Sequence, residues 1–228
     1  MYNVFALFLM LICYSAMSSA SADFDGGMAA FQQGSYDVVL REWRPLAEAG
    51  HVGAQVGLGL MYATGKGVLE DDTEAEKWYR MAAEQGNALA QYNLGVIYRN
   101  GKGVARDPVE GAKWYKMAAA QGVPEAQFNL GTMYENGEGV AESHVEALRW
   151  YEQAGARGLV VAQAALGSIY SGGVGVPKNY VTAYLWWSLA KSQGHKIAEK
   201  NLEILISRMT AAEEEEGDAL VKNWRRKP

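Results

Sequence analysis

Apolar residues along most of this chain are spaced as they are on amphipathic helices. Between Ala90 and Tyr98 they fall three or four positions apart, and most of those between Ala112 and Ala118 do the same. This spacing places the apolar side chains on one face of a helix, and that face has to be buried against another element. The pattern predicts two helices with a short connection between them, which together form a helical hairpin.

The same pattern returns every thirty-six residues. The positions that keep this interval carry a Gln, a Leu-Gly pair, a Tyr, a Trp and a Gly, and they are Gln55, Gln91, Gln127 and Gln163; Leu58, Leu94, Leu130 and Leu166 with Gly59, Gly95, Gly131 and Gly167; Tyr62, Tyr98, Tyr134 and Tyr170; Trp78, Trp114, Trp150 and Trp186; and Gly50, Gly86, Gly122, Gly158 and Gly194. A segment this short cannot bury its own apolar face and is stable only when neighbouring segments stack on it. We therefore expect an all-α fold, an α-solenoid of stacked helix-turn-helix repeats with capping helices at both ends.

The connection between the two helices of a repeat carries residues that end and start helices. Gly101 and Gly103 supply positive-φ conformations, which a residue with a Cβ resists, and so end the first helix. Asp107 followed by Pro108 predicts the start of the second helix, because Asp accepts hydrogen bonds at the N-cap and Pro suits the first helical position. Gly122 is expected to end that helix.

Small and large residues alternate in a way that favours close packing. Gly95 and Ala118 would let two helices approach each other, while Trp114 and Tyr115 would fill the space between repeats. If Trp114 belongs to the core, its replacement by Ala should cost about 3–5 kcal/mol of stability.

The repeat pattern is incomplete at the N-terminal end. Tyr36 and Trp43 lead to Gly50 as a second helix alone, which makes a half repeat. The segment from Met28 to Gln33 before it has the atypical sequence expected of a terminal cap.

Beyond Gly194 the thirty-six-residue interval is lost. Residues Ile197 to Met209 predict one more amphipathic helix, whose apolar side carries Leu202, Leu205, Ile206 and Met209. Thr210 and Glu213 have the spacing of a capping box and predict a last helix, with acidic residues near its start and with Arg225, Arg226 and Lys227 near its end. A solvated closing helix is expected here, and an acidic interaction tail is the alternative.

The first residues have the features of a signal peptide. An apolar stretch from Val4 to Met17 is too short for a typical spanning helix and is followed by the small residues Ala20 and Ala22, which suit signal peptidase. Cleavage is expected after Ala22, so the mature protein would be periplasmic or secreted. No Lys or Arg precedes the apolar stretch, and an uncleaved membrane anchor is the alternative.

The repeating residues resemble a known family. One repeat of the chain resembles the Sel1-like repeat, a relative of the tetratricopeptide repeat. The residues that carry the resemblance are Ala90-Gln91-Tyr92-Asn93-Leu94-Gly95, Tyr98, Asn100-Gly101-Lys102-Gly103-Val104, Ala112-Lys113-Trp114-Tyr115 and Ala118-Ala119 with Gly122. On this resemblance the chain divides into a signal peptide (1–22), an N-terminal cap with a half repeat (23–53), four repeats (54–194, in units of 54–89, 90–125, 126–161 and 162–194) and C-terminal capping helices (195–228). The resemblance implies a right-handed α-solenoid that serves as a scaffold and binds proteins or peptides.

Composition and charge narrow the possible functions. The net charge of −5 argues against general nucleic-acid binding, which needs a basic surface. Cys13 is the only cysteine, so the mature chain would carry none. The cysteine-rich branch of Sel1-like proteins, some described as penicillin-binding or β-lactamase-like, staples each hairpin with a disulfide, and this chain lacks those pairs.

No residue pattern indicates catalysis or metal binding. His51, His144 and His195 have no His, Cys or carboxylate at a recognised metal spacing, and the Gly-Lys-Gly turns lack the remaining residues of a phosphate-binding loop. We therefore expect no catalytic residue, no metal and no cofactor.

The first helices of the repeats are expected to line the inner face, where positions that do not repeat are free to differ. By similarity to tetratricopeptide repeats, the amides of Asn93 and Asn129 would hydrogen-bond a peptide, Tyr92 and Phe128 would give apolar contact, and Arg99 and Glu135 would set specificity. Packing between hairpins is the alternative role for the two aromatic residues, and the end of the array at Trp186 and Trp187 is the alternative location for binding.

The function expected from the sequence is a non-enzymatic, exported adaptor that binds a protein or peptide on this face. The resemblance implies roles in envelope signalling, envelope assembly or engagement of host proteins. The alternatives are a weak penicillin-recognising cell-wall hydrolase and a structural spacer associated with lipid or wall.

Overall fold

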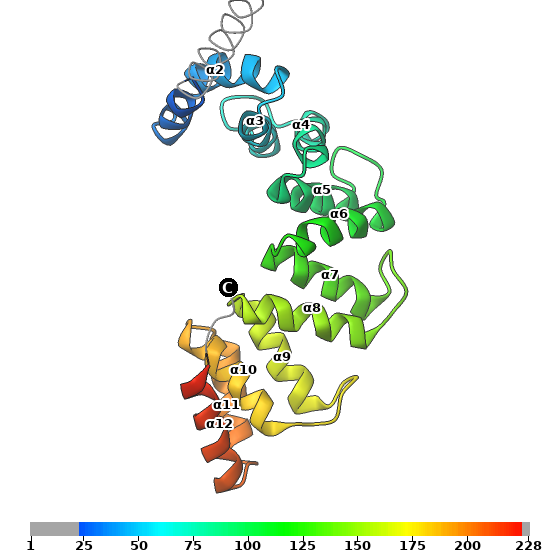
Figure 1. Ribbon diagram of the computed structural model, residues 1–228, viewed down its shortest axis with the longest axis vertical. Helices are drawn as coiled ribbons and strands as arrows, with labels where there is room; N and C mark the ends of the chain where they lie inside the picture. The colour runs from blue at the N-terminus through cyan, green and yellow to red at the C-terminus, as the bar shows by residue number, and fades with distance from the viewer. Residues whose placement is uncertain (1–22, 225–228) are drawn as a thin grey trace, which may run out of the picture. The chain divides into compact units, whose positions relative to one another are not determined.

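The computed structural model describes residues 23–224, and over this range the chain is helical without β-strands (Figure 1). Residues 23–32 are helical and precede the helices α2 (Tyr36–Glu48), α3 (Val52–Thr64), α4 (Asp72–Glu84), α5 (Ala88–Asn100), α6 (Pro108–Ala120), α7 (Pro124–Asn136), α8 (His144–Ala156), α9 (Val160–Gly172), α10 (Tyr180–Ser192), α11 (Lys196–Ile206) and α12 (Ala211–Asn223). The predicted all-α class is confirmed. The expected signal peptide with its cleavage after Ala22, and the basic residues Arg225, Arg226 and Lys227, lie outside the described residues.

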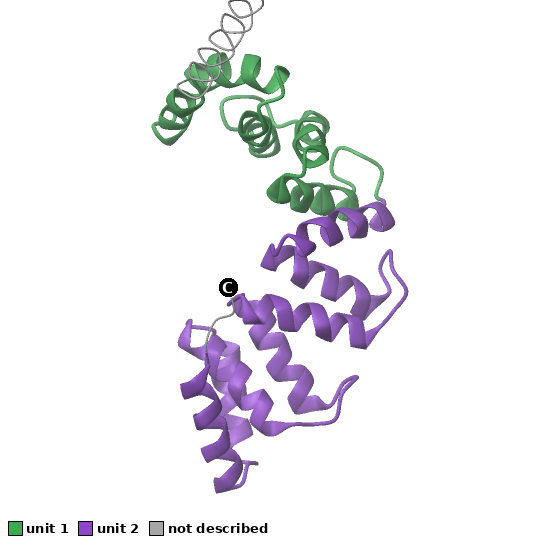
Figure 2. Ribbon diagram, viewed as in Figure 1, with its two compact units in different colours: residues 1–106 green, residues 107–228 purple. Residues whose placement is uncertain are grey.

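The chain forms two compact units, residues 1–106 and 107–228, and the boundary falls in the loop between α5 and α6 (Figure 2). In unit 1, α2 packs on α3, α3 on α4 and α4 on α5. In unit 2, α6 packs on α7, α7 on α8, α8 on α9 and α9 on α10, and α10 is covered by both α11 and α12. Consecutive helices thus stack on one another in each unit, as expected for a solenoid of helical hairpins.

Glycine allows the two helices of a hairpin to touch. A Cβ added at Gly59 of α3 would lie 2.7 Å from the ring of Tyr79 on α4, and one added at Gly131 of α7 would lie equally close to the ring of Tyr151 on α8. Real Cβ atoms do not approach other atoms this closely, so a larger residue would push the helices apart. The repeating aromatic residue of the second helix therefore needs the repeating glycine of the first.

The glutamine that repeats in every first helix is buried and connects successive repeats. Its side-chain amide donates to a backbone carbonyl eight residues earlier, at the end of the preceding second helix. The four bonds run from Gln55 Nε2 to Ala47 O (3.0 Å), Gln91 Nε2 to Ala83 O (3.1 Å), Gln127 Nε2 to Ala119 O (3.0 Å) and Gln163 Nε2 to Gly155 O (3.0 Å). Each of these carbonyls also accepts from the backbone amide of the repeating glycine three residues later, so the glutamine adds a second hydrogen bond at the helix end.

The repeating tyrosine makes a second connection between repeats. Tyr62 Oη accepts a hydrogen bond from Arg44 of α2 (2.8 Å), and Tyr170 Oη donates to Glu152 Oε1 of α8 (2.7 Å). In α5, Tyr98 Oη donates to Glu76 Oε1 of α4 (2.6 Å) and also contacts Arg80. For these three tyrosines the partners lie eighteen or twenty-two residues earlier, on the preceding second helix.

The Gly-x-Gly turn requires glycine for two reasons, a positive φ and a close contact with the neighbouring helix. Gly101 and Gly103 have φ values of 73° and 68°, and the Gly101 amide closes α5 by donating to Ile97 O (2.8 Å). Gly103 also lies directly against α4, where an added Cβ would be 2.6 Å from the Thr73 amide nitrogen, and its carbonyl accepts a hydrogen bond from Thr73 Oγ1 (3.1 Å). The turn therefore needs glycine both for its backbone conformation and for its contact with the neighbouring helix.

The predicted start residues of the second helices are confirmed where they were named. Asp107 Oδ1 accepts from the Glu110 amide (3.0 Å), and Pro108 occupies the first helical position of α6. Thr210 and Glu213 form a complete capping box at the start of α12. Trp114 is buried, with 8% of its surface exposed, as expected of a core residue.

The predicted end of the helix from Ile197 to Met209 was wrong. The helix α11 stops at Ile206, because the next residues close a tighter turn in which Arg208 N donates to Leu205 O (2.8 Å) and Met209 N to Ile206 O (3.1 Å). Leu202 and Leu205 are buried as expected, and Ile206 and Met209 pack against the same core. None of the helices among residues 23–224 has both the length and the apolar composition to cross a membrane.

Candidate binding surface on the first helices

Three of the six predicted contact residues lie on α5 in unit 1. Tyr92, Asn93 and Arg99 are each half-buried, between the fully buried positions Gln91 and Leu94 and the end of the helix. Arg99 belongs to the last turn of α5, where a positive charge interacts favourably with the partial negative charge of the helix end.

The other three lie on α7 in unit 2, where Phe128, Asn129 and Glu135 are also half-buried. Tyr151 of α8 contacts two of them. Its ring centroid is 5.3 Å from that of Phe128, and its hydroxyl donates to Glu135 Oε2 (2.7 Å). Phe128 therefore packs within its own hairpin, whereas the alternative role placed it between hairpins. Glu135 is held in place by a charge-assisted hydrogen bond.

The two asparagines differ from their neighbours because their side-chain amides are unused. Among the described residues, the amides of Asn93 and Asn129 have no hydrogen-bond partner; Asn129 takes part only through its backbone carbonyl, which accepts from Thr132 Oγ1 (2.7 Å). A side-chain amide offers two donors and one acceptor, which is what a peptide backbone requires. These amides are available to a ligand.

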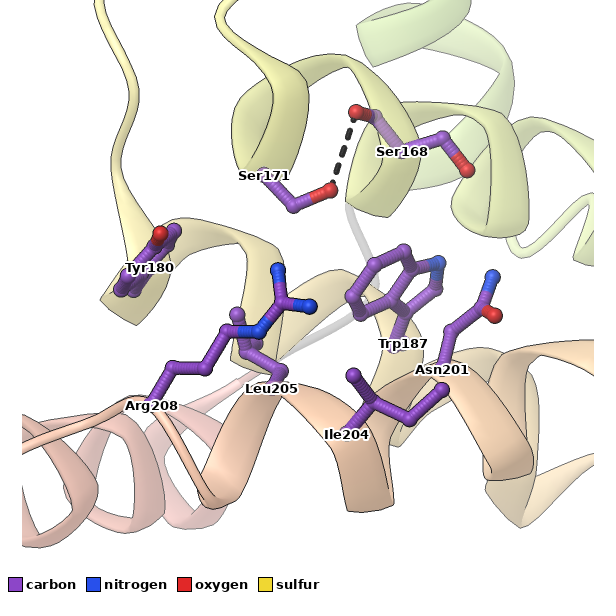
Figure 3. Close-up of a pocket in the computed structure, with 8 residues that line it drawn as sticks. All are labelled: Ser168, Ser171, Tyr180, Trp187, Asn201, Ile204, Leu205 and Arg208. Atoms are coloured by element: carbon purple, nitrogen blue, oxygen red, sulfur yellow. Dashed lines mark hydrogen bonds between the residues drawn. The ribbon is translucent and has the colours of Figure 1, made fainter.

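A pocket of about 220 Å³ lies near the C-terminal end of unit 2 (Figure 3). Serines of α9, Tyr180 and Trp187 of α10, Asn201 of α11 and Arg208 of the turn after α11 contribute to its wall. Trp187 belongs to the end of the array that was the alternative location for binding. Reasoning from the sequence missed Asn201 and Arg208, because both lie beyond the last repeat and no periodic pattern marks them.

A smaller hollow of about 160 Å³ lies in unit 1 between the cap and α3. Its lining is apolar and includes Phe31, Trp43 and Leu60, with Gly53 and Gly57 leaving space beside them. It offers no charged or polar side chain that would select a ligand.

The histidines at the starts of first helices have a structural role. His51 Nδ1 accepts from the Ala54 amide and His195 Nδ1 from the Ala198 amide, both at 3.1 Å, so each imidazole caps its helix. The same position, thirty-six residues on from His51, is Asn87, whose side chain caps α5. Within residues 23–224, no group of three or more His, Cys, Asp or Glu is arranged to hold a metal ion.

Tyr98 on α5 and Tyr184 on α10 remain protonated well above neutral pH. The pKa of Tyr98 is raised to about 12, first by burial and then by the hydrogen bond to the Glu76 carboxylate and its charge, against the opposing effect of Arg80. Burial, followed by the hydrogen bond to Asp218, also raises the pKa of Tyr184 to about 12. At neutral pH these hydroxyls therefore act as hydrogen-bond donors.

Stacked helical hairpins with an exposed, variable side on the first helix define a helical-repeat protein. Comparison with known families finds the Sel1 repeat at residues 52–87, 88–123, 124–159 and 160–195. The chain belongs to the Sel1 repeat family.

Solved structures agree with this assignment. The chain is similar to c5321, a protective antigen of uropathogenic Escherichia coli with an SLR fold, with 32% identity over 90% of this chain and 45% of that one and a TM-score of 0.79. It is also similar to a Sel1 repeat protein from Oxalobacter formigenes, with 32% identity over 78% of this chain and 73% of that one and a TM-score of 0.73.

One similar protein has a described role. An exopolysaccharide production negative regulator of Rhizobium meliloti (strain 1021) is 42% identical over 62 residues. The aligned part spans 27% of this chain and 23% of the regulator, so the chain matches about a quarter of the curated relative. The aligned length is shorter than two thirty-six-residue repeats.

Proposed function

We propose that this protein is a non-enzymatic scaffold that binds a peptide or protein segment on the half-exposed sides of its first helices. One observation supports this most directly. Positions that repeat, such as Gln91 and Leu94, are buried, whereas Tyr92, Asn93 and Arg99 beside them are only half-buried. These neighbours therefore keep part of their side-chain surface accessible to a bound segment, which the repeating positions do not.

The chemistry of each helix suits part of a peptide. Asn93 and Asn129 offer amides to a peptide backbone, and the partly exposed faces of Tyr92 and Phe128 offer apolar contact. Arg99 on α5 and Glu135 on α7 have opposite charges at the same position of successive repeats. Each helix would therefore prefer a different charge on the bound segment.

The names of the similar proteins indicate only a general kind of role. The Rhizobium protein is named a negative regulator, and the Escherichia coli protein a protective antigen. A regulator that acts by holding another protein fits a scaffold. We extend to this chain only the general role of regulation or recognition through binding.

Export to the periplasm or the exterior is part of the proposal and rests on the sequence of residues 1–22. The test fuses these residues to alkaline phosphatase that lacks its own leader, since this enzyme becomes active only after export. An active fusion, together with a mature protein that begins at Asp23, supports export. An inactive fusion contradicts it.

Binding is tested by crosslinking and capture from an extract of the source cells. Arg99→Glu and Glu135→Arg each reverse one charge at the proposed surface, and Lys116→Glu reverses a charge on the exposed side of the second helix α6 as the matched control. We expect one partner to be lost with either surface variant and kept with the control, while circular dichroism shows all three folded. Equal capture by all three variants would place binding elsewhere.

The hydrolase alternative has a separate test. Purified mature protein is incubated with nitrocefin, and we expect no turnover. Turnover that a single side-chain substitution abolishes would overturn the non-enzymatic proposal.

A further inference from the structure

The pocket at the C-terminal end of unit 2 combines one cation with hydrogen-bond acceptors and an apolar floor. Ser168 and Ser171 come from α9, Trp187 from α10, and Asn201 and Arg208 from α11 and the turn that follows it (Figure 3). Its volume of about 220 Å³ is below the range of roughly 300–1,000 Å³ that is typical for drug-sized ligands. The pocket therefore suits one amino-acid residue rather than a larger molecule.

Arg208 provides the positive charge. Its side chain makes no ion pair or hydrogen bond with any residue of the range 23–224, and no carboxylate is among the described residues that line the pocket. Figure 3 shows the side chain extended so that the guanidinium lies over the pocket rather than along α11. A guanidinium with five free N–H donors favours a carboxylate, which it can hold with two parallel hydrogen bonds.

The serines present acceptors rather than donors. Ser171 Oγ donates to Ser168 O (3.1 Å), and Ser168 Oγ donates to Ala164 O (3.2 Å), so both hydroxyl protons are used within α9. The lone pairs of these oxygens remain available to an N–H group. Among the described residues the side-chain amide of Asn201 also has no partner, and it can accept or donate.

The floor of the pocket is apolar. Leu205 and Trp187 are buried, with 3% and 5% of their surface exposed, and Trp187 Nε1 already donates to Ala164 O (3.1 Å). Ile204 beside them is 52% exposed. An apolar group placed against Ile204 would remove this surface from water.

We propose that this pocket binds the C-terminal residue of a peptide whose last side chain is apolar. The terminal carboxylate pairs with Arg208, the backbone N–H of the same residue donates to Ser171 Oγ, and the side chain covers Ile204 and Leu205. The inference rests on the proposed peptide-binding function and adds the class of ligand and a site outside the six predicted contact residues.

The test uses the full mature chain and the peptide acetyl-Ala-Ala-Leu in two forms, with a free carboxylate and with an amidated end. Binding is measured by titration calorimetry and by the NMR signal of the Trp187 indole N–H, assigned with Trp187→Phe. We expect saturable binding of the free acid with a shift of this signal, and binding of the amide that is weaker by about tenfold or more.

Variants identify the residue that reads the carboxylate. Arg208→Gln should weaken binding of the free acid to the level of the amide, because it removes the cation and keeps much of the side chain. Lys200→Gln removes one positive charge from an exposed position of α11 outside the pocket and should leave binding unchanged. Circular dichroism confirms that both variants are folded.

Three outcomes would overturn the proposal. They are the absence of binding by the unaltered chain, equal affinity for the free acid and the amide, and an Arg208→Gln variant that binds as well as the parent. A fourth is equal affinity for acetate, which has neither the N–H nor the apolar side chain and would show that the pocket takes any small carboxylate. Because none of these measurements involves Arg99 or Glu135, failure here is distinct from failure of the proposed scaffold function, which the capture experiment tests.

Discussion

The side chain of Gln127 is buried, and its Oε1 has no hydrogen-bond partner. In two other repeats the equivalent oxygen is satisfied, because Gln85 Nε2 donates to Gln55 Oε1 (2.8 Å) and Gln193 Nε2 donates to Gln163 Oε1 (2.9 Å). The residue thirty positions after Gln127 is Arg157 instead of glutamine, and its side chain is exposed. Because Arg157 stands where two other repeats have a glutamine, the buried Gln127 Oε1 is left without a donor.

We predict that Arg157→Gln stabilises unit 2 by about 1 kcal/mol, because it restores a buried hydrogen bond to Gln127 Oε1. Urea unfolding followed by circular dichroism measures the change. Gln85→Arg is the reverse control in unit 1 and should destabilise by about 1–3 kcal/mol, since it leaves Gln55 Oε1 without its donor. A loss of stability on Arg157→Gln would show that Arg157 makes a more valuable contact than the glutamine would.

The buried tyrosines predict a decline in stability at alkaline pH. Tyr98 and Tyr79 have pKa values raised to about 12 in the folded chain, in both cases chiefly by burial, against about 10 in an unfolded chain. The folded state therefore holds the phenolic proton more tightly, so this stabilisation is complete below pH 10 and is lost as the pH rises through 12. The midpoint of thermal unfolding should fall over this range.

The measurement combines thermal unfolding between pH 8 and 12 with titration of phenolate absorbance. Tyr98→Phe removes one titrating group and should make the decline shallower, although it also loses the hydrogen bond to Glu76. If all tyrosines of the folded chain titrate near pH 10, the expected decline has no basis.

At the scale of helices, the first helices differ in whether a side chain caps their N-terminus, although the backbone conformation at the cap is nearly the same. Asn87 has φ −67° and ψ 116°, and its side chain caps α5 through the Ala90 amide (2.9 Å). Val123 has nearly the same conformation, φ −69° and ψ 111°, and makes no side-chain cap on α7. The geometry for a cap is present there without the residue to use it.

We predict that Val123→Asn stabilises the chain by about 1 kcal/mol, because the new side chain can accept from the Ala126 amide as Asn87 does from Ala90. Asn87→Val, the matched exchange in unit 1, should cost a similar amount. Both are measured by urea unfolding. If Val123→Asn is destabilising, the apolar contacts of the half-buried valine outweigh the cap.

The hairpins were predictable because their determinants are local. Gly101, Gly103 and the pair Asp107-Pro108 lie within one connection, and each acts through its own backbone conformation or capping bond. The end of α11 was missed because a tight turn at Ser207 and Arg208, with no glycine or proline to mark it, replaces the last turn of the helix while Met209 keeps its apolar contact. The apolar pattern of a helix therefore continues to Met209, although the helical backbone ends at Ile206.

The candidate sites were less accessible to sequence reasoning. The period identified Asn93 and Asn129 as variable positions, but it did not show that Phe128 and Glu135 both meet the Tyr151 side chain of the neighbouring helix. Arg208 has no equivalent in the repeats, so only the packing of α11 beside α9 and α10 reveals that it lines a pocket. The roles of these residues depend on contacts between helices, and such contacts cannot be read from one sequence.

At the scale of the molecule, a repeat array loses stability first at uncovered ends, because each repeat contacts only its neighbours. Aromatic residues cover both ends here. Trp43 stacks with Phe24 and Phe31 at centroid distances of 5.6 and 5.7 Å, and Trp224 meets Trp186 edge-on at 5.0 Å. These contacts replace the missing neighbour at each end.

The last helix, α12, seals the C-terminal end through a close contact with α10. Tyr184 Oη donates to Asp218 Oδ1 (2.6 Å), and a Cβ added at Gly217 would lie 2.7 Å from the Tyr184 ring. We predict that Gly217→Val displaces α12, because the ring cannot move away without opening the core that it helps to form. Amide hydrogen exchange in α10 and α12 should then accelerate by about tenfold or more, consistent with a loss of roughly 1–3 kcal/mol.

The spatial pattern of that acceleration tests the stacked architecture itself. If each repeat is stabilised by its neighbours, the effect should weaken from α10 to α7 and be absent in α3 of unit 1. Gly172→Ala is the matched control, because a Cβ there meets Val174 at an ordinary 3.6 Å and the glycine has no positive φ. Equal acceleration in every helix would mean that the chain unfolds as one cooperative body, and unchanged exchange in α10 would mean that α12 does not seal the array.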